Sequence, residues 1–279
     1  MANAPLPILQ IRDLTVSYRT PQGGVTAVAG VDLDVAAGEC VGLVGESGSG
    51  KTQLLLSILN LLSPQARVAG SVCYRGTELL GLNAGALNRI RGARIAMIFQ
   101  DPMTALNPYL RVMEQLGEVA RLHSGLSRRA AEARALAMIE AVHIGEPARR
   151  ARQYPHELSG GMRQRIMIAM ALMAEPEIIL ADEPTTALDV TVQAQVLALL
   201  QELRERTGVA LVLVTHDLGV VAQLADRIGV MRAGRIVELA ACEELFARPT
   251  HPYTRALLSA LPRLDTGEPL LPAADPVLP

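Results

Sequence analysis

The chain has 279 residues, of which 50% are hydrophobic and only 3% aromatic, and its formal net charge at pH 7 is −2. This length allows one large α/β domain with a subdomain, or two small domains, built around an aliphatic core. The small net charge offers no general basic surface for nucleic acid. The cysteines at positions 40, 73 and 242 show no metal or disulfide spacing, so we expect a reduced, cytosolic setting.

The N-terminus has no charged segment followed by an apolar one, so no signal peptide is expected. The longest apolar runs, at 166–174 and 209–214, are too short to cross a bilayer. We therefore expect a chain that is soluble by itself and reaches a membrane through a partner.

The first predicted elements form a small antiparallel unit. Apolar and polar residues alternate over 8–18 and again over 31–35, with a turn signal at 21–24 between them. The first strand ends at Tyr18. Its ring is either ordinary strand packing or a platform on which an adenine ring stacks.

The stretch GESGSGKT at 45–52 has the form Gly, four residues, Gly-Lys-Thr, between a buried strand at 39–45 and an apolar-faced helix at 52–62. This is a P-loop, in which backbone N–H groups and the helix N-terminus bind phosphate and the threonine hydroxyl binds Mg²⁺. Lys51 is the only lysine in the sequence, and a planar guanidinium does not reproduce its compact charge. The predicted phosphate-binding residues are Gly45, Glu46, Ser47, Gly48, Ser49, Gly50, Lys51 and Thr52.

The next predicted elements are a strand at 70–76, a helix at 81–92 and a strand at 94–100. This last strand ends on Gln100, where open α/β sheets place ligand contacts. The pattern is then helical from about 109 to 145. ELSGG at 157–161 precedes a further helix, so its Ser-Gly-Gly turn is either a second anion site or an ordinary N-cap.

Two carboxylates, Asp182 and Glu183, end a continuous apolar strand at 177–184. Burying these charges costs free energy, so we expect that a functional site uses them. Asp182 is placed to hold Mg²⁺ through water, and Glu183 to orient or deprotonate an attacking water. An amphipathic helix follows, and then a buried strand at 208–216 ends on His216. A lone histidine is often structural, but three strands ending in Gln, Asp-Glu and His after a P-loop strand together indicate a site.

The C-terminal part begins with a strand, a turn at Ala233–Gly234 and a second strand within 226–240. A short amphipathic helix is predicted at 251–265. Residues 262–279 hold five prolines, so we expect a mobile extension.

Taken together, these motifs resemble the ATP-binding cassette ATPases over nearly the whole chain. The matching stretches are the P-loop, Gln100, LSGGMRQR (158–165), ILADEP (179–184), ALD (187–189) and His216. LSGG decides the resemblance, because other P-loop ATPases lack it. Within the family, GESGSGKTQ, FQDPMTALNP, ADEPTTALDVTVQAQ and HPYTRALL are similar to the oligopeptide/dipeptide/nickel importer branch, and to the first of its two ATPase subunits.

The resemblance implies an α/β fold: a P-loop NTPase (RecA-like) parallel-sheet core, an N-terminal antiparallel β subdomain and a helical subdomain insert at about 101–175. The ATPase domain would span 1–247, and residues 248–279 would be an importer-type extension with a Pro-rich tail. The helical insert would form a groove for a coupling helix of a membrane subunit.

The resemblance also implies that two ATPase domains sandwich two nucleotides head to tail. Ser159, Gly160 and Gly161 would then touch the γ-phosphate held by the partner. Gln100 would help to bind Mg²⁺ and sense the γ-phosphate, Asp189 would signal across the dimer, and His216 would hold the γ-phosphate and the attacking water. Tyr18 falls where the family keeps its adenine-stacking aromatic.

The implied cofactors are ATP and Mg²⁺. The implied partners are a related but different second ATPase, hence a heterodimer, and two integral membrane permease subunits, with an extracytoplasmic solute-binding protein acting indirectly. The chain would lie peripherally on the cytoplasmic face of the inner membrane. No nucleic acid is expected, because the long coiled-coil insertion or second cassette of the non-transport members is missing. The complete set of hydrolytic residues argues against an inactive, regulatory cassette.

Three departures from the family pattern are visible. Thr52 replaces the commoner serine, and Met162 replaces a glutamine after LSGG. The tail lacks the cysteine cluster that some relatives use, so no iron–sulphur cluster is predicted. The expected cargo is a di- or oligopeptide. The short tail favours the alternative, nickel or another small solute.

Overall fold

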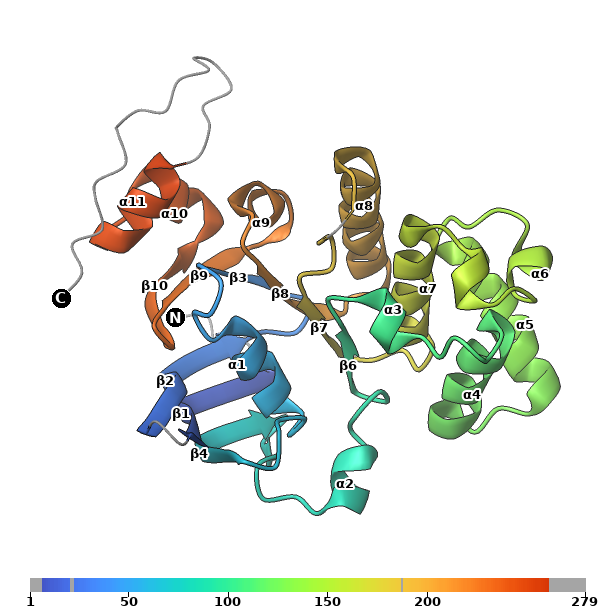
Figure 1. Ribbon diagram of the computed structural model, residues 1–279, viewed down its shortest axis with the longest axis horizontal. Helices are drawn as coiled ribbons and strands as arrows, with labels where there is room; N and C mark the ends of the chain where they lie inside the picture. Colours follow the sequence, from blue (N-terminus) through green and yellow to red (C-terminus); the bar gives the residue numbers. More distant parts are fainter. Residues whose placement is uncertain (1–6, 21–22, 187, 261–279) are drawn as a thin grey trace, which may run out of the picture.

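A six-stranded sheet with the order β10-β9-β3-β8-β7-β6 forms the centre of the molecule (Figure 1). The computed structural model describes residues 7–20, 23–186 and 188–260. All neighbouring strands in this sheet are parallel except β9 and β10, which form the antiparallel pair expected around Ala233–Gly234. The strands are β3 (Cys40–Val44), β6 (Ile95–Ile98), β7 (Ile178–Asp182), β8 (Ala210–Thr215), β9 (Arg227–Arg232) and β10 (Arg235–Ala241). The predicted parallel-sheet core is confirmed.

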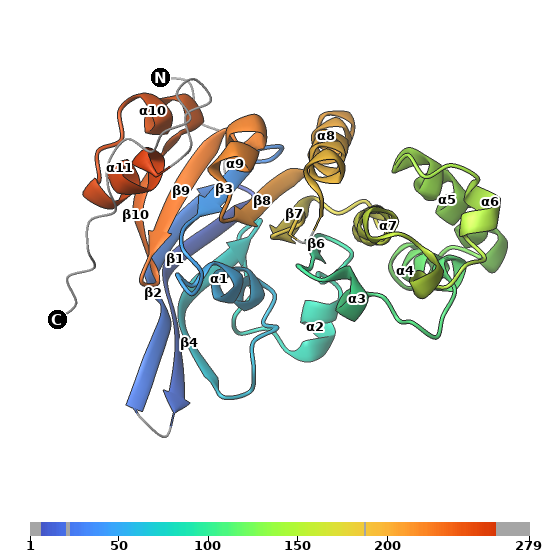
Figure 2. The same ribbon diagram turned by 45° about the horizontal axis from the view of Figure 1, so that its top comes forward.

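A second, antiparallel sheet has the order β2-β1-β4-β5, as expected for the N-terminal part. Its strands are β1 (Leu9–Thr20), β2 (Gly23–Val35), β4 (Ala66–Tyr74) and β5 (Thr77–Glu78). β2 and β4 begin earlier than their alternation predicts, because backbone pairing with β1 continues where side chains are mostly exposed. The β1–β2 hairpin therefore projects beyond the rest of the sheet (Figure 2).

The segment between β6 and β7 forms a helical lobe, which we define as residues 102–172 and which lies at one end of the molecule (Figure 1). Its helices are α3 (Pro102–Ala105), α4 (Val112–Ser124), α5 (Arg128–Ala141), α6 (Pro147–Arg150), the short 3₁₀ turn at Pro155–Glu157 and α7 (Gly160–Leu172). The remaining helices are α1 (Lys51–Ile58), α2 (Ala84–Asn88), α8 (Val190–Thr207), α9 (Leu218–Leu224), α10 (Cys242–Ala247) and α11 (Pro252–Ser259).

The central sheet is buried on both faces, which explains why its strands are apolar without alternation. Along β3, Val41 and Leu43 join the core shared with α1 and the antiparallel sheet. Cys40 and Val44 join the core shared with α7, α8 and the helical lobe. Side chains of a strand alternate between its faces, so one short strand serves both cores.

Three helices are shorter than predicted. α1 ends at Ile58 rather than 62, because Asn60 adopts a left-handed φ of 49°. Arg91 then donates to the carbonyls of Leu59 and Asn60, which lie beyond the end of the helix. α2 begins only at Ala84, where Asn83 caps it. α11 ends at Ser259, and the predicted extension at 262–279 lies outside the described residues.

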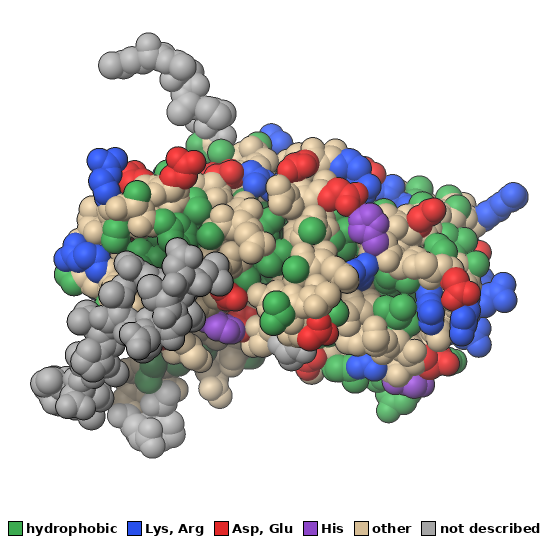
Figure 3. All heavy atoms as spheres, turned by 90° about the horizontal axis from the view of Figure 1, so that it is seen from above, with side chains coloured by type: hydrophobic (Ala, Val, Ile, Leu, Met, Phe, Trp, Pro, Cys, Tyr) green, Lys and Arg blue, Asp and Glu red, His purple; other side chains and the backbone are tan. Residues whose placement is uncertain are grey.

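Within the described part of the chain, none of the helices combines the length and the apolar character of a membrane span. On the face shown in Figure 3, acidic and basic side chains are interspersed, with basic side chains most frequent at the end occupied by the helical lobe.

Candidate active site

The predicted site residues follow four neighbouring parallel strands of the central sheet, β3, β8, β7 and β6. The P-loop follows β3, His216 follows β8, Asp182 and Glu183 end β7, and Gln100 lies shortly after β6. Parallel strands present their carboxyl ends at one edge of the sheet, where such folds bind ligands. The fold therefore brings the residues of four separate motifs to one edge.

The P-loop is shaped by glycines that no other residue can replace. Gly45 and Gly50 have φ values of 157° and 102°. A Cβ atom at Gly45 would lie 2.2 Å from the Met231 carbonyl oxygen, and one at Gly50 would lie 2.2 Å from that of Ala27. The loop thus packs directly against neighbouring backbone before α1 begins at Lys51.

Lys51 is buried, with 5% of its surface exposed. Its Nζ donates to the carbonyl oxygens of Gly45 at 2.8 Å and Glu46 at 2.9 Å. Burial lowers the pKa of its ammonium, and the carboxylates of Glu183, Asp182 and Glu46 oppose that shift. A buried ammonium in a phosphate-binding loop is suited to an anionic ligand, because a buried charge is stabilised by a partner of opposite sign.

Asp182 is the buried acid of the site, with 4% exposure. Burial raises the pKa of its carboxyl; Glu183 adds to that shift, whereas Thr52 and Lys51 oppose it. The Thr52 hydroxyl donates to Asp182 Oδ1 at 3.1 Å. Hydroxyl and carboxylate oxygens are hard ligands of the kind Mg²⁺ prefers, and Gln100, which donates to the adjacent Glu183, carries an amide oxygen of the same kind. These residues fit Mg²⁺.

Glu183 is held by side chains from the loops that follow β6, β7 and β8. Its Oε2 accepts from Gln100 Nε2 at 3.1 Å and from the Thr186 hydroxyl at 2.7 Å. Its Oε1 lies 3.3 Å from Nδ1 of His216. Glu183 also has a left-handed φ of 45°, and its N–H donates to the Val214 carbonyl at 2.8 Å. An unusual backbone conformation fixed by several contacts is frequent at functional sites.

Tyr18 lies beside the first turn of α1. Its hydroxyl donates to Gln53 Oε1, and burial raises the pKa of that hydroxyl. Gln53 follows directly on Thr52, so the ring of Tyr18 stands next to the end of the phosphate-binding loop.

Ser159, Gly160, Gly161 and Asp189 lie elsewhere. Ser159 and Asp189 are the N-caps of α7 and α8, accepting from the backbone N–H groups of Met162 and Val192. Within the described residues, no hydrogen bond or ion pair joins these four residues to the P-loop. Figure 1 shows α7 in the helical lobe, apart from α1.

Two contacts of the site escaped the sequence patterns. The Thr186 hydroxyl donates to Glu183 from three positions further along the chain, within the stretch ADEPTT. Tyr253 contacts the P-loop through the N–H of Glu46, 207 positions away. No local pattern predicts a contact over that separation.

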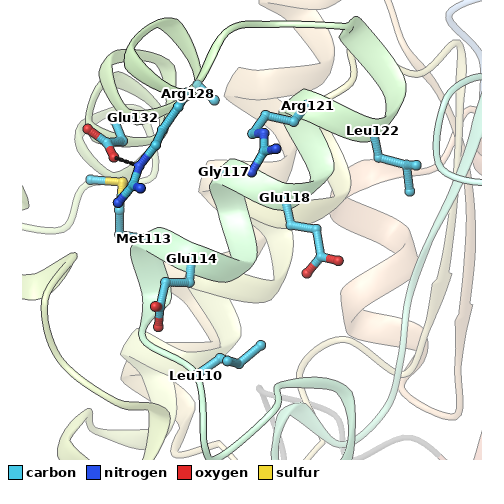
Figure 4. Close-up of a pocket in the computed structure, with 10 residues that line it drawn as sticks. Leu110, Met113, Glu114, Gly117, Glu118, Arg121, Leu122, Arg128 and Glu132 are labelled. Atoms are coloured by element: carbon cyan, nitrogen blue, oxygen red, sulfur yellow. Dashed lines mark hydrogen bonds and ion pairs between the residues drawn. The ribbon is translucent and has the colours of Figure 1, made fainter.

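A pocket of about 620 Å³ lies away from these residues, between α4 and α5 (Figure 4). Its charged lining carries both signs, and Arg128 pairs with Glu132 at 3.0 Å. None of its lining residues belongs to the nucleotide motifs. The pocket therefore does not contribute to the chemistry at the sheet edge.

Residues 28–186, more than half of the chain, match the family model described as ABC transporter. The chain belongs to the ATP-binding cassette transporter family. Residues 237–276 of this ABC ATPase also match the model described as oligopeptide/dipeptide transporter, C-terminal region. This match begins within β10, earlier than the extension expected from 248.

Curated relatives place the ABC ATPase in the expected branch. It is 50% identical to the oligopeptide transport ATP-binding protein OppD of Haemophilus influenzae over 94% of this chain and 81% of that protein. It is 51% identical to the dipeptide transport ATP-binding protein DppD of Bacillus subtilis over 92% of this chain and 78% of that protein. The predicted membership of this branch is confirmed.

Solved structures agree with the fold. The post-hydrolysis dimer of the ATP-binding cassette MJ0796, bound to ADP and Pi, has a TM-score of 0.75 and 31% identity, covering 84% of this chain and 98% of that one. A cbiO1 protein from Clostridium perfringens has a TM-score of 0.73 and 25% identity, covering 87% of this chain and 91% of that one. The predicted cassette fold is confirmed.

Proposed function

We propose that this ABC ATPase hydrolyses ATP to drive the uptake of di- or oligopeptides through partner membrane subunits. The observation that carries the proposal is the position of Glu183, tied to Gln100 and His216 at the edge of the sheet where the P-loop lies. The names of the relatives favour peptides over nickel, the alternative suggested by the short tail.

In this proposal the P-loop N–H groups and Lys51 hold the phosphates of ATP. Thr52, Asp182 and Gln100 hold Mg²⁺, which when bound neutralises charge on the phosphates. Glu183 accepts a proton from the attacking water, and His216 orients that water and the γ-phosphate. Tyr18 stacks on the adenine. Hydrolysis then depends mainly on positioning and on charge stabilisation.

The proposed site needs a second ATPase. Ser159, Gly160 and Gly161 lie at the start of α7, away from the P-loop of their own chain. In a head-to-tail dimer they would contact the γ-phosphate that the partner's P-loop holds. Asp189 would lie at the same interface between the two ATPases. We infer a related but different partner chain, so a heterodimer.

The proposed docking site for a membrane subunit is an apolar groove of about 250 Å³. Phe99 and Leu61 line it and are 39% and 40% exposed, so the groove presents two large, partly exposed apolar side chains. Helical-lobe residues such as Val119 and Met167 form the other wall. A coupling helix of a permease subunit would fit here. It would contact both the core of the chain and the helical lobe, because residues of both line the groove. The chain would then sit peripherally on the cytoplasmic face of the inner membrane, below a solute-binding protein that it does not touch.

The proposal is tested with Glu183→Gln in the assembled transporter. The amide keeps the size of the side chain but cannot take a proton, so ATP binding should persist. Turnover should fall by about a hundred- to ten-thousandfold, the range for loss of a general base. ATP hydrolysis and ATP binding by calorimetry measure the two effects.

Glu205→Gln is the matched control, since Glu205 is exposed on α8 and accepts a hydrogen bond from Gln201 of the same helix. It should leave turnover unchanged. A fall of less than tenfold in Glu183→Gln would show that another group is the base. A wild-type transporter that hydrolyses ATP without stimulation by any peptide-loaded binding protein would contradict peptide as the cargo.

A further inference from the structure

The sequence HPY at 251–253 opens α11 and has a definite local geometry. His251 is the N-cap, and its Nδ1 accepts from the backbone N–H of Tyr253 at 3.1 Å. Pro252 occupies the first helical position, where its missing N–H has no cost. The backbone at Tyr253 is therefore fixed at the very start of the helix.

Tyr253 points at the P-loop. Its hydroxyl oxygen lies 3.4 Å from the backbone nitrogen of Glu46 and accepts from that N–H. The residue is only 8% exposed, and the guanidinium of Arg232 lies 4.9 Å from the centre of its ring. Burial raises the pKa of the hydroxyl, so the phenol stays protonated and neutral at physiological pH.

Glu46 is the residue that Tyr253 and Lys51 share. While its N–H donates to Tyr253, its carbonyl accepts from Lys51 Nζ at 2.9 Å. The turn after Arg232 adds a second brace, because the N–H of Gly234 donates to the Ser49 carbonyl at 3.0 Å. The C-terminal part of the chain thus contacts the P-loop at two of its peptide groups.

The segment that carries Tyr253 is itself anchored. The Glu238 carboxylate on β10 accepts from the Thr250 N–H at 2.7 Å, the Thr250 hydroxyl at 2.8 Å and the His251 N–H at 3.0 Å. Leu245 of α10 is fully buried, and it belongs to the same core cluster as Cys40 and Val44 of the central sheet. The residues just before Tyr253 are therefore fixed by hydrogen bonds, and its ring is fixed by the contact with Arg232.

We propose that Tyr253 is a positioning residue that holds the P-loop in its phosphate-binding shape, so that the C-terminal segment sets the nucleotide affinity. A loop that is already ordered loses less freedom when it binds its ligand. At 3.4 Å this hydrogen bond is long, so we expect its loss to weaken nucleotide binding rather than abolish it. The proposal rests on the nucleotide site proposed above.

Tyr253→Phe tests this directly, because it removes the hydroxyl and keeps the ring beside Arg232. In the full chain, ADP and ATP should bind about three- to tenfold more weakly by calorimetry, the range for one net hydrogen bond. In the assembled transporter, KM for ATP should rise by the same factor while kcat at saturating ATP stays constant. The Glu46 amide should exchange its hydrogen faster than in the wild-type chain.

Tyr109→Phe is the matched control, since the Tyr109 side chain is 87% exposed on the helical lobe, and it should change nothing. Arg232→Gln is a second probe that frees the ring without altering the hydroxyl, and it should weaken binding in the same direction. Wild-type affinity and wild-type Glu46 exchange in Tyr253→Phe would overturn the proposal. Failure of the wild-type chain to bind nucleotide would instead overturn the nucleotide site itself.

Discussion

At the scale of single residues, Lys51 differs from the other positively charged residues of the chain. It is the only lysine, and the other 25 residues among Lys and Arg are arginine. The structure gives the reason for lysine: Nζ is enclosed by two loop carbonyls and the Ser49 hydroxyl, with 5% of the residue exposed. A guanidinium presents its N–H groups in a rigid planar fork, which does not match acceptors gathered around one nitrogen atom.

We expect Lys51→Arg to weaken ADP and ATP binding by about a hundredfold, the effect of losing a charged hydrogen bond worth about 3 kcal/mol. Calorimetry on the full chain measures the affinity. Arg121→Lys, the reverse exchange at an exposed position on α4, should leave it unchanged. Retention of wild-type affinity by Lys51→Arg would mean that charge alone, rather than shape, is required at this position.

At the scale of elements, strand ends and the loops after them create the chemistry. Glu183 leaves β7 with a left-handed φ of 45°, and this turn lets its carboxylate meet Gln100 and His216 from the neighbouring strands. The β9–β10 pair has a different task. It braces the P-loop through Gly234 and anchors the segment before α11 through Glu238.

The Glu238 anchor should make stability depend on pH. Burial by itself would raise the pKa of Glu238, but the nearby Thr254 hydroxyl and the N–H groups of Thr250 and His251 outweigh it and lower the pKa from 4.5 to about 2. A lowered folded-state pKa stabilises the fold above about pH 4.5 and loses that contribution as pH falls toward 2.

Glu238→Gln should therefore lower the free energy of unfolding at pH 7, and the difference from wild type should narrow below pH 4.5. Urea unfolding at a series of pH values measures this. Glu118→Gln, at an exposed position on α4, serves as the control and should show no such trend. A difference that is the same at pH 7 and pH 3.5 would show that the charge of Glu238 is not what anchors the segment.

At the scale of the whole molecule, the function proposed above assigns half of a catalytic site to the core of the chain and the other half to its helical lobe. The sheet edge carries the P-loop and Glu183, whereas Ser159 caps α7 in the lobe. This separation is the reason for proposing a head-to-tail partner. It also predicts that damage to one half impairs the other subunit's chemistry.

Ser159→Arg should leave ATP binding by the isolated chain unchanged, because Ser159 is not near its own P-loop. ATP hydrolysis by the assembled transporter should fall by about a hundredfold, as when one donor to a transition state is lost. Ser127→Arg is the control: Ser127 is likewise an N-cap in the lobe, accepting from Ala130 N–H at 3.3 Å, but is in no motif. Equal loss of hydrolysis in both variants would point to damage to the lobe instead.

Much of the architecture was predictable because its signals are local. The P-loop glycines, the apolar strands and the polar side chains at their ends are all read within short windows of sequence. Helix ends were less predictable: α1 stops at Ile58 because Asn60 turns left-handed and Arg91, 31 and 32 positions from its two acceptors, donates to the carbonyls beyond the helix end. No window around α1 contains that arginine.

The identity of the side chains at the ends of β3, β6, β7 and β8 follows from the sequence, since a strand and the residue that ends it are adjacent in the chain. Which of these side chains meet depends on the order of the strands in the folded sheet. The order β3-β8-β7-β6 places Glu183 between Gln100 and His216, and it leaves Ser159 in the lobe. Strand order and the 207-residue contact from Tyr253 to Glu46 arise from packing distant segments around shared cores, which no local pattern encodes.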